Sequence, residues 1–266
     1  MISIVTAYHN RKELFYQTLK SIEKSQFKDI ELIAVDDCSS SEHRLEPYLD
    51  EFPFLKIIRL EQKDKWYINP CVPFNKGISK ANGDIIVLQN PECLHVHDVL
   101  TYISENINDE NYISISAYGL ESRLTKLLPE HIKNGTLLDF FNTFPQRPYR
   151  GYDMSGWYNH SIYRPVHFHF CSAITRNNMK KLNGFDERFA YGIAYDDDEI
   201  VARIRILGLK LHIENSVSVI HQYHASGWNS PNAGQLCDLN RLLIDNYTRK
   251  ENRYKANLNS LWTKTI

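Results

Sequence analysis

The chain has 266 residues, 42% of them hydrophobic and 24% charged, which is the composition of an ordinary globular protein and excludes a disordered or fibrous one. Its 31 Lys and Arg residues against 32 Asp and Glu residues give a net charge of −1, so the overall balance does not favour nucleic acid or an acidic membrane surface as a partner. No run approaches the roughly 20 apolar residues of a transmembrane segment, and no secretory leader pattern opens the chain, so we expect a cytoplasmic protein with at most a peripheral membrane contact.

Alternating strand and helix patterns occupy the first third of the chain. Apolar, β-branched runs at 2–6 and 30–35 predict two buried parallel strands. Leu14, Leu19 and Ile22 recur between them at helical spacing, which completes a βαβ unit. Further strands are predicted at 55–60 and 84–88, with a helix at 74–81. This order predicts an α/β fold with an open, mainly parallel sheet flanked by helices.

The pattern is less regular after Pro91. Helices are predicted at 98–106, 177–182, 197–207 and 235–247, and strands at 112–118, 167–175 and 217–221. Residues 120–166 carry several prolines and glycines and fit no periodic pattern. Loops of this length inside a domain usually carry function.

Polar side chains follow the first two strands. The first strand ends in Thr6-Ala7-Tyr8-His9-Asn10-Arg11 and the second in Asp36-Asp37-Cys38-Ser39-Ser40. Ligands of open α/β sheets bind beyond the carboxyl ends of the strands, where an aromatic ring can stack on a base and a carboxylate can accept a hydrogen bond from a base or ribose. The same residue types also cap turns, so each motif alone leaves both interpretations open.

Together the motifs resemble the nucleotide-sugar-binding half of the GT-A glycosyltransferases, above all family two. The matching segments are Val5-Thr6-Ala7-Tyr8-His9-Asn10-Arg11, Leu19-Lys20-Ser21-Ile22, Val35-Asp36-Asp37-Cys38-Ser39 and Phe74-Asn75-Lys76-Gly77-Ile78-Ser79-Lys80-Ala81-Asn82-Gly83-Asp84-Ile85-Ile86. The resemblance is good over 1–95 and moderate over 167–224. It implies a GT-A type fold in which Tyr8 and Asn10 lie near the base, Asp37 near a uracil or equivalent ring, and Asp36 beside it. The full set of residues predicted to bind the nucleotide is Thr6, Tyr8, Asn10, Arg11, Asp36, Asp37, Asn75, Gln89 and Asn90, the last two as amide donors to the diphosphate.

The sequence departs from this family after the fourth strand. The family has Asp-x-Asp there, and its last carboxylate holds a divalent cation against the diphosphate. This chain has Leu88-Gln89-Asn90-Pro91-Glu92 instead. Three alternatives remain open: Glu92 supplies an oxygen ligand to Mn²⁺ or Mg²⁺; the diphosphate is held without metal by the Gln89 and Asn90 amides and by basic or histidine side chains; or the site is inactive and the protein only binds or scaffolds.

Four acids begin the predicted helix at 197–207, in the run Tyr195-Asp196-Asp197-Asp198-Glu199-Ile200-Val201-Ala202-Arg203. Acids stabilise a helix amino terminus, but crowded carboxylates also raise one another's pKa, which suits a proton acceptor. The run resembles the Glu-Asp-x-Asp-Leu-x-x-Arg motif of family two, and Gly184-Phe185-Asp186-Glu187-Arg188-Phe189 resembles the segment that precedes it. This resemblance implies that Asp197 is the general base of an inverting transfer and that Asp196 replaces the family's Glu.

Histidines supply further candidates. Some GT-A enzymes place a metal or diphosphate ligand at the end of the last strand, and here His221 is favoured over His224. His167 and His169 would share one side of the predicted strand at 167–175, where a polar wall beside the donor sugar is favoured over a metal site. Residues 225–230 are predicted to form a closing loop whose Trp228 packs on a sugar ring.

These features predict one GT-A domain over 1–266, with a nucleotide-binding half at 1–95, an acceptor and catalytic half at 96–234 and a helical segment at 235–266. The predicted activity is transfer of a sugar from a nucleotide-diphosphate donor, with a UDP-sugar favoured, to a glycan, lipid-linked or protein acceptor in surface glycan or polysaccharide synthesis. The alternatives are a degenerate nucleotide-sugar-binding module and a nucleotidyltransferase. The second is disfavoured because no glycine-rich phosphate loop follows the first strand.

Overall fold

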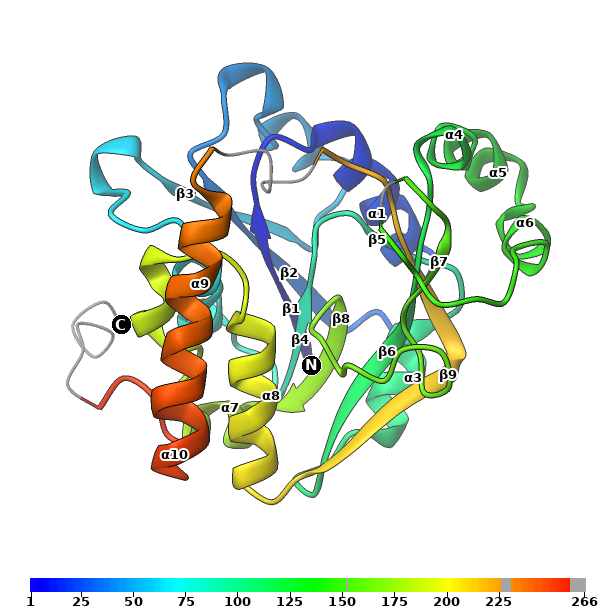
Figure 1. Ribbon diagram of the computed structural model, residues 1–266. Coiled ribbons are helices and arrows are strands. Elements are labelled where there is room, and N and C mark those ends of the chain that lie inside the picture. The colour runs from blue at the N-terminus through cyan, green and yellow to red at the C-terminus, as the bar shows by residue number, and fades with distance from the viewer. Residues whose placement is uncertain (152, 226–230, 259–266) are drawn as a thin grey trace.

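The computed structural model describes residues 1–151, 153–225 and 231–258, and Figure 1 shows its backbone. Within these residues one sheet of nine strands has the order β3-β2-β1-β4-β8-β6-β9-β5, with β7 paired to β6. The strands are β1 (Ile2–Tyr8), β2 (Ile30–Asp37), β3 (Leu55–Leu60), β4 (Ile85–Gln89), β5 (Cys93–His95), β6 (Asn111–Gly119), β7 (Gly156–Asn159), β8 (Cys171–Thr175) and β9 (Lys210–His221).

Helices connect and cover these strands. The α-helices are α1 (Lys12–Glu23), α2 (Cys71–Lys80), α3 (Val99–Asn106), α4 (Ser122–Thr125), α5 (Leu128–Asn134), α6 (Leu137–Asn142), α7 (Arg176–Leu182), α8 (Asp196–Ile206), α9 (Ala233–Leu243) and α10 (Arg249–Glu251). Short 3₁₀ turns lie at Ser41–His43, Glu46–Tyr48, Gln62–Asp64 and Glu187–Tyr191, and a π-turn at Ile244–Thr248 follows α9. No described helix combines the length and apolarity needed to span a bilayer.

Most strands point in one direction. β1 pairs in parallel with β2 and β4, and β2 pairs in parallel with β3. β8 is antiparallel to both β4 and β6, and β9 is parallel to β6, so β6 and β9 run in the same direction as the first four strands. β5, β7 and β8 run in the opposite direction. The predicted open, mainly parallel sheet is therefore confirmed, and we call the end where the six co-directional strands finish the carboxyl edge.

Each face of the sheet is covered by its own helices. On one face Ile2, Ile4 and Tyr8 of β1 pack with α1 and α3. On the other face Val5 packs with α2, α7 and α8. Gly77 of α2 allows this close approach, because a Cβ atom there would overlap Cγ1 of Val5. In Figure 1, α7 and α8 lie on one side of the sheet and α1 and α3 on the other.

The region that resisted prediction, 120–166, contains α4, α5, α6 and β7. These elements enclose a third core in which Leu128, Phe141 and Trp157 surround Tyr118 of β6. Figure 1 shows α4, α5 and α6 as a separate group beyond the β6 and β7 end of the sheet. This region is held together by aromatic residues that are distant in sequence and buried together, so no local periodicity predicts its helices and strand.

Two predicted strands have different limits. The strand predicted at 167–175 begins only at Cys171, because His167 has a left-handed φ of 62° and His169 lies in a turn. The prediction that His167 and His169 share a strand face is therefore wrong. The last strand begins at Lys210 rather than 217, and a register shift between Ile115 and Ser116 lets β6 pair with its whole length.

Candidate active site

Asp37 is the most accessible acid at the end of β2. Its Oδ1 accepts a hydrogen bond from Tyr67 Oη at 2.7 Å, and its Oδ2 lies 2.7 Å from Lys65 Nζ. The side chain keeps 14% of its surface exposed. His9 adds a contact from Nδ1 to the backbone oxygen of Asp37 at 2.7 Å. This carboxylate is therefore held in a fixed orientation at the carboxyl edge.

The loops that follow β1 and β2 are tied together by Asn10. Its backbone N–H donates to Ser39 Oγ at 3.0 Å, and its Oδ1 accepts from the backbone N–H of Ser40 at 2.9 Å. Asn10 has a φ of 49°, a left-handed conformation that asparagine tolerates better than most residues. The exposed Asn10 therefore joins the two loops into one surface beside Asp37.

Five of the nine residues predicted to bind nucleotide have side chains that are at most 1% exposed: Thr6, Tyr8, Asp36, Asn75 and Gln89. A side chain without accessible surface cannot contact a ligand in this structure. The prediction of direct contact is corrected for these five, which instead support the carboxyl edge from behind.

The partners of the buried residues show what they support. Tyr8 donates to the backbone oxygen of His43 at 2.6 Å, and burial raises its pKa, so the hydroxyl stays neutral. The Asp36 carboxylate accepts the Ser39 N–H at 2.9 Å and pairs with Arg59 at 2.6 Å, which shapes the loop after β2. The Thr6 hydroxyl has no hydrogen-bond partner among the described residues.

Gln89 and Asn90, predicted to hold the diphosphate, and Asn75, predicted to bind the nucleotide, lie in different environments. Gln89 Nε2 donates to the backbone oxygen of Cys93 at 2.8 Å inside the core, so it is not available to a ligand. Asn75 holds the loop before α8, donating to the backbone oxygen of Phe185 at 2.9 Å and accepting its N–H at 2.7 Å. Asn90 is half-buried, and its side-chain amide has no partner among the described residues. Of these three, only Asn90 remains a candidate.

Glu92 is the centre of a charged cluster formed by three distant segments. Arg11 Nη1 lies 2.8 Å from its Oε2, and the Nε2 atoms of His221 and His224 each lie 3.2 Å from its Oε1. The Glu92 side chain is 2% exposed, while Arg11 keeps 29%. We call these four residues the Glu92 cluster. The cluster contains three predicted site residues, Arg11, Glu92 and His221. It also contains His224, which was the less favoured of the two histidines predicted as a metal or diphosphate ligand.

The Glu92 cluster passes a chemical test for a divalent cation. One carboxylate and two imidazoles offer ligand atoms that all lie within 4.8 Å of one another. Burial opposes ionisation of Glu92, but Arg11, His224 and His221 outweigh it and hold its pKa well below the usual range. Burial lowers the pKa of His221, which favours the neutral imidazole that binds metals. The donor set suits Mn²⁺ better than Mg²⁺, which prefers oxygen ligands.

A second cluster lies at the start of α8. Asp197 is 27% exposed, and its Oδ1 lies 2.5 Å from Nδ1 of the buried His169. The same oxygen accepts the backbone N–H of His169 at 3.0 Å. His169 Nε2 faces Oδ2 of Asp196 at 4.0 Å. An imidazole lies between the two predicted catalytic acids, and we call these three residues the acid–histidine unit.

Burial and the neighbouring charge of Asp197 raise the pKa of Asp196 to about 6. Asn69 Nδ2 donates to Asp196 Oδ1 at 3.1 Å. Burial opposes the charge of His169, but Asp197 and Asp196 outweigh it and raise the pKa of the imidazole. These three residues also offer ligand atoms within 4.8 Å of one another, but the raised pKa of His169 favours the protonated imidazole, which does not bind metals, and we assign no metal there.

The turn that presents these acids is strained and firmly held. Ala194 and Tyr195 both have positive φ, 59° and 65°, which costs about 1–3 kcal/mol for each non-glycine residue. Asn240 of α9 donates to the backbone oxygen of Ala194 at 2.8 Å. Further along α8, the buried Arg203 contacts Glu199 at 2.6 and 2.7 Å. The start of the helix is therefore fixed from two sides.

Tyr158 of β7 connects the two clusters through ring contacts with His221 of the Glu92 cluster and with Phe170, which follows His169 in the chain. Burial raises its pKa. Its ring packs against His221 at 5.2 Å and Phe170 at 4.5 Å between centroids. The acid–histidine unit and the Glu92 cluster therefore belong to one site.

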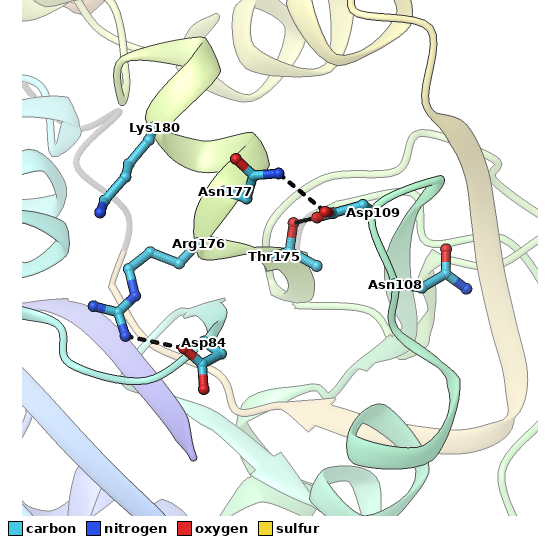
Figure 2. Close-up of a pocket in the computed structure, with 7 residues that line it drawn as sticks. All are labelled: Asp84, Asn108, Asp109, Thr175, Arg176, Asn177 and Lys180. Carbon is cyan, nitrogen blue, oxygen red and sulfur yellow. Dashed lines mark hydrogen bonds and ion pairs between the residues drawn. The ribbon is translucent and has the colours of Figure 1, made fainter.

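A different hollow, of about 680 Å³, lies at the opposite edge of the sheet. Figure 2 shows Arg176 directed towards Asp84, and Thr175 and Asn177 directed towards Asp109. It contains none of the predicted site residues. Its charged groups compensate one another, so it carries no candidate chemistry.

The sequence analysis missed several site residues. His169 was noted but placed on a strand face, and Asn69, Lys65 and Tyr67 were not considered because they lie in the loop before α2. Tyr158 lay in the unassigned region. Residues 226–230, which include Trp228 of the predicted closing loop, lie outside the described residues.

Comparisons with known proteins identify the family and the fold. The family model described as Glycosyl transferase family 2 matches residues 3–182. No match was found among curated proteins. The solved structure of the mannosyltransferase PcManGT from Pyrobaculum calidifontis, in complex with GDP-Man and Mn²⁺, is 14% identical with a TM-score of 0.56, over 85% of this chain and 58% of that one. TarS 1-349 from S. aureus, in complex with UDP-GlcNAc, is 15% identical with a TM-score of 0.57, over 92% of this chain and 66% of that one.

These similarities confirm the predicted GT-A type fold. At such low identity the solved structures support the fold alone. The chain also spans only 58% of the length of the mannosyltransferase.

Proposed function

The chain belongs to glycosyl transferase family 2, and from this membership and the geometry of the carboxyl edge we propose that it transfers a sugar from a nucleotide-diphosphate donor to an acceptor hydroxyl with inversion. The observation that carries the proposal is the acid–histidine unit. Asp197 is partly exposed and rigidly oriented at the start of α8, beside the cluster that contains Glu92. A carboxylate so placed can take a proton from an attacking hydroxyl.

The donor binds along the ends of β1 and β2 in this proposal. Asp37 and Asn10 offer oriented hydrogen-bonding groups to the base and ribose, and Arg11 offers a guanidinium to the diphosphate. A UDP-sugar is the proposed donor, supported by the similarity to a structure solved with UDP-GlcNAc. GDP-mannose is the necessary comparison, because the other similar structure was solved with it.

Glu92, His221 and His224 would hold the divalent cation, which we propose to be Mn²⁺. When bound, it would supply positive charge against the leaving nucleoside diphosphate. Arg11 contacts the same carboxylate and lies on the side of the cluster nearest the β1 loop, where it contributes a second positive charge.

The remaining features are proposed on the resemblance of the sequence. The chain acts in the cytoplasm as one catalytic domain, with the donor side at 1–95 and the acceptor side at 96–234. Residues 120–166 are proposed to select a glycan, lipid-linked or protein acceptor in surface glycan or polysaccharide synthesis. The third core of this region supplies its framework.

The test compares Asp197→Asn with Asp238→Asn, the same change on an exposed carboxylate of α9. Wild-type protein is incubated with a panel of nucleotide sugars and acceptors, and nucleotide release, product anomers and donor binding are measured. We expect Asp197→Asn to lose transfer by about 10³-fold or more while donor binding persists, and Asp238→Asn to behave as wild type. An active Asp197→Asn protein would refute the assignment, and a wild type that binds donors without turnover would identify a degenerate binding module.

A further inference from the structure

We propose that His169 is a positioning residue that orients the carboxylate of Asp197, places a compensating charge beside it and determines which of its oxygens receives the acceptor proton. The inference rests on the proposed role of Asp197 as base and deepens it. It concerns a residue just before β8 that touches neither of the donor-binding loops.

The contacts of His169 single out one oxygen of Asp197. Both the backbone N–H, at 3.0 Å, and ring Nδ1, at 2.5 Å, meet Oδ1. Among the described residues no partner contacts Oδ2. Because Asp197 retains 27% exposure, Oδ2 is the atom that faces an incoming hydroxyl.

The environment of His169 favours a single orientation and a positive charge. The side chain is 4% exposed, and its ring lies edge-on to Phe74 at 4.9 Å and Phe185 at 5.1 Å between centroids. Each ring nitrogen has one carboxylate nearest to it: Nδ1 lies 2.5 Å from Asp197 Oδ1, and Nε2 lies 4.0 Å from Asp196 Oδ2. An imidazole between two carboxylates is stabilised as the imidazolium.

Two phenols and a thiol around the unit are neutral, while the nearby carboxylates of Glu199 and Asp186 pair with Arg203 and Arg188. Burial raises the pKa of Tyr112 on β6, of Tyr158 on β7 and of Cys71 on α2. The charges that act on His169 come from Asp197 and Asp196 on α8. An imidazolium at His169 lies between the two acids, and its positive charge compensates their adjacent negative charges.

Removing the cation should push a proton onto the pair. Two adjacent carboxylates without compensation cannot both ionise easily, and the pKa of Asp196 is already raised to about 6 by burial and by Asp197. His169→Gln retains a polar side chain but not the charge. Asp196→Asn has the opposite effect, because it removes the like charge and leaves Asp197 paired with His169 alone.

The experiment measures kcat and KM from about pH 5.5 to about pH 9. We expect the acid limb of the kcat profile to move up by about one unit or more in His169→Gln and down in Asp196→Asn, with KM for the donor unchanged. Near neutrality His169→Gln should lose about tenfold or more in kcat and regain much of it at high pH. His212→Gln is the matched control, because His212 also lies 3.2 Å from a carboxylate but is 53% exposed and remote from the site.

Equal loss of kcat at every pH would show that His169 is only structural, and unchanged profiles in both variants would show that it has no role. If His169→Gln does not fold, His169→Asn takes its place, and an acid limb that does not move up in that variant overturns the inference. Failure of the proposed function gives a different result, an active Asp197→Asn protein.

Discussion

Replacing Glu92 by Gln tests whether the Glu92 cluster is a cation site or a closed ion-pair network. The substitution preserves size and removes the charge that Arg11, His221 and His224 share. A cation site should lose its affinity, because the carboxylate is the one anionic ligand of the three. An ion-pair network should lose stability but show no response to metal in either protein.

The expected magnitudes differ enough to separate the two cases. A cation at 100 times its Kd stabilises the folded state by about 2.7 kcal/mol, which for a chain of this size raises Tm by about 5–10 °C. Breaking a fully buried ion pair costs about 3–5 kcal/mol. Arg11 keeps 29% of its side chain exposed, so water can solvate it after the change, and we expect Glu92→Gln to cost about 1–3 kcal/mol without metal.

The assay is thermal unfolding of chelator-stripped protein titrated with Mn²⁺ and, separately, Mg²⁺. Wild type should show the larger shift with Mn²⁺, and Glu92→Gln should show none. His224→Ala should also lose most of the shift while its Tm without metal stays near wild type, because the Glu92–Arg11 pair remains. His212→Ala, an exposed histidine beside a carboxylate elsewhere, should keep the full shift. A full Mn²⁺ shift in Glu92→Gln, or no shift in wild type at saturating Mn²⁺, would refute the cation site.

Two further pairs of substitutions test the framework behind the site. Gly77→Ala should destabilise the protein by about 1–3 kcal/mol, because the new methyl group overlaps Cγ1 of Val5. Gly234→Ala on α9, where a Cβ atom would have nothing within 4 Å, should stabilise the protein by up to about 1 kcal/mol. Urea unfolding measures both free energies, and effects of equal sign would contradict the packing argument. Arg203→Met should lower the free energy of unfolding by about 3–5 kcal/mol, because it leaves the buried Glu199 without its partner. Adding Glu199→Leu should recover part of this loss. A double variant no more stable than the single one would show that the unpaired charge is not the cause.

The position of the acids at the start of α8 was predictable because it depends on spacing along one helix. Asp196 and Asp197 lie in the first turn, where predicted, and Arg203 pairs with Glu199 one turn away. His169, which completes the acid–histidine unit, was not predictable, because its position depends on how the turn before β8 packs against α2 and α8.

The sequence also predicted the direction of the first strands, but the binding prediction did not consider which face of the sheet each side chain occupies. Thr6 and Tyr8 alternate with Ala7 and so share the face of Ile2 and Ile4, which α1 buries completely. The motif correctly predicted that these residues lie at the carboxyl edge of the sheet. The strand period of two directs their side chains into the core beneath α1, away from a ligand at that edge.

The sequence by itself determined the order of elements, the direction of the first four strands and the segments that gather at the carboxyl edge, because these depend on local periodicity and on the handedness of βαβ units. Only the tertiary structure decided which side chains in those segments remain accessible and which distant ones meet. Glu92, His221 and Arg11 converge because β5 pairs with the end of β9 beside the loop after β1. Such a meeting depends on packing and strand order across the whole sheet, which no local pattern encodes.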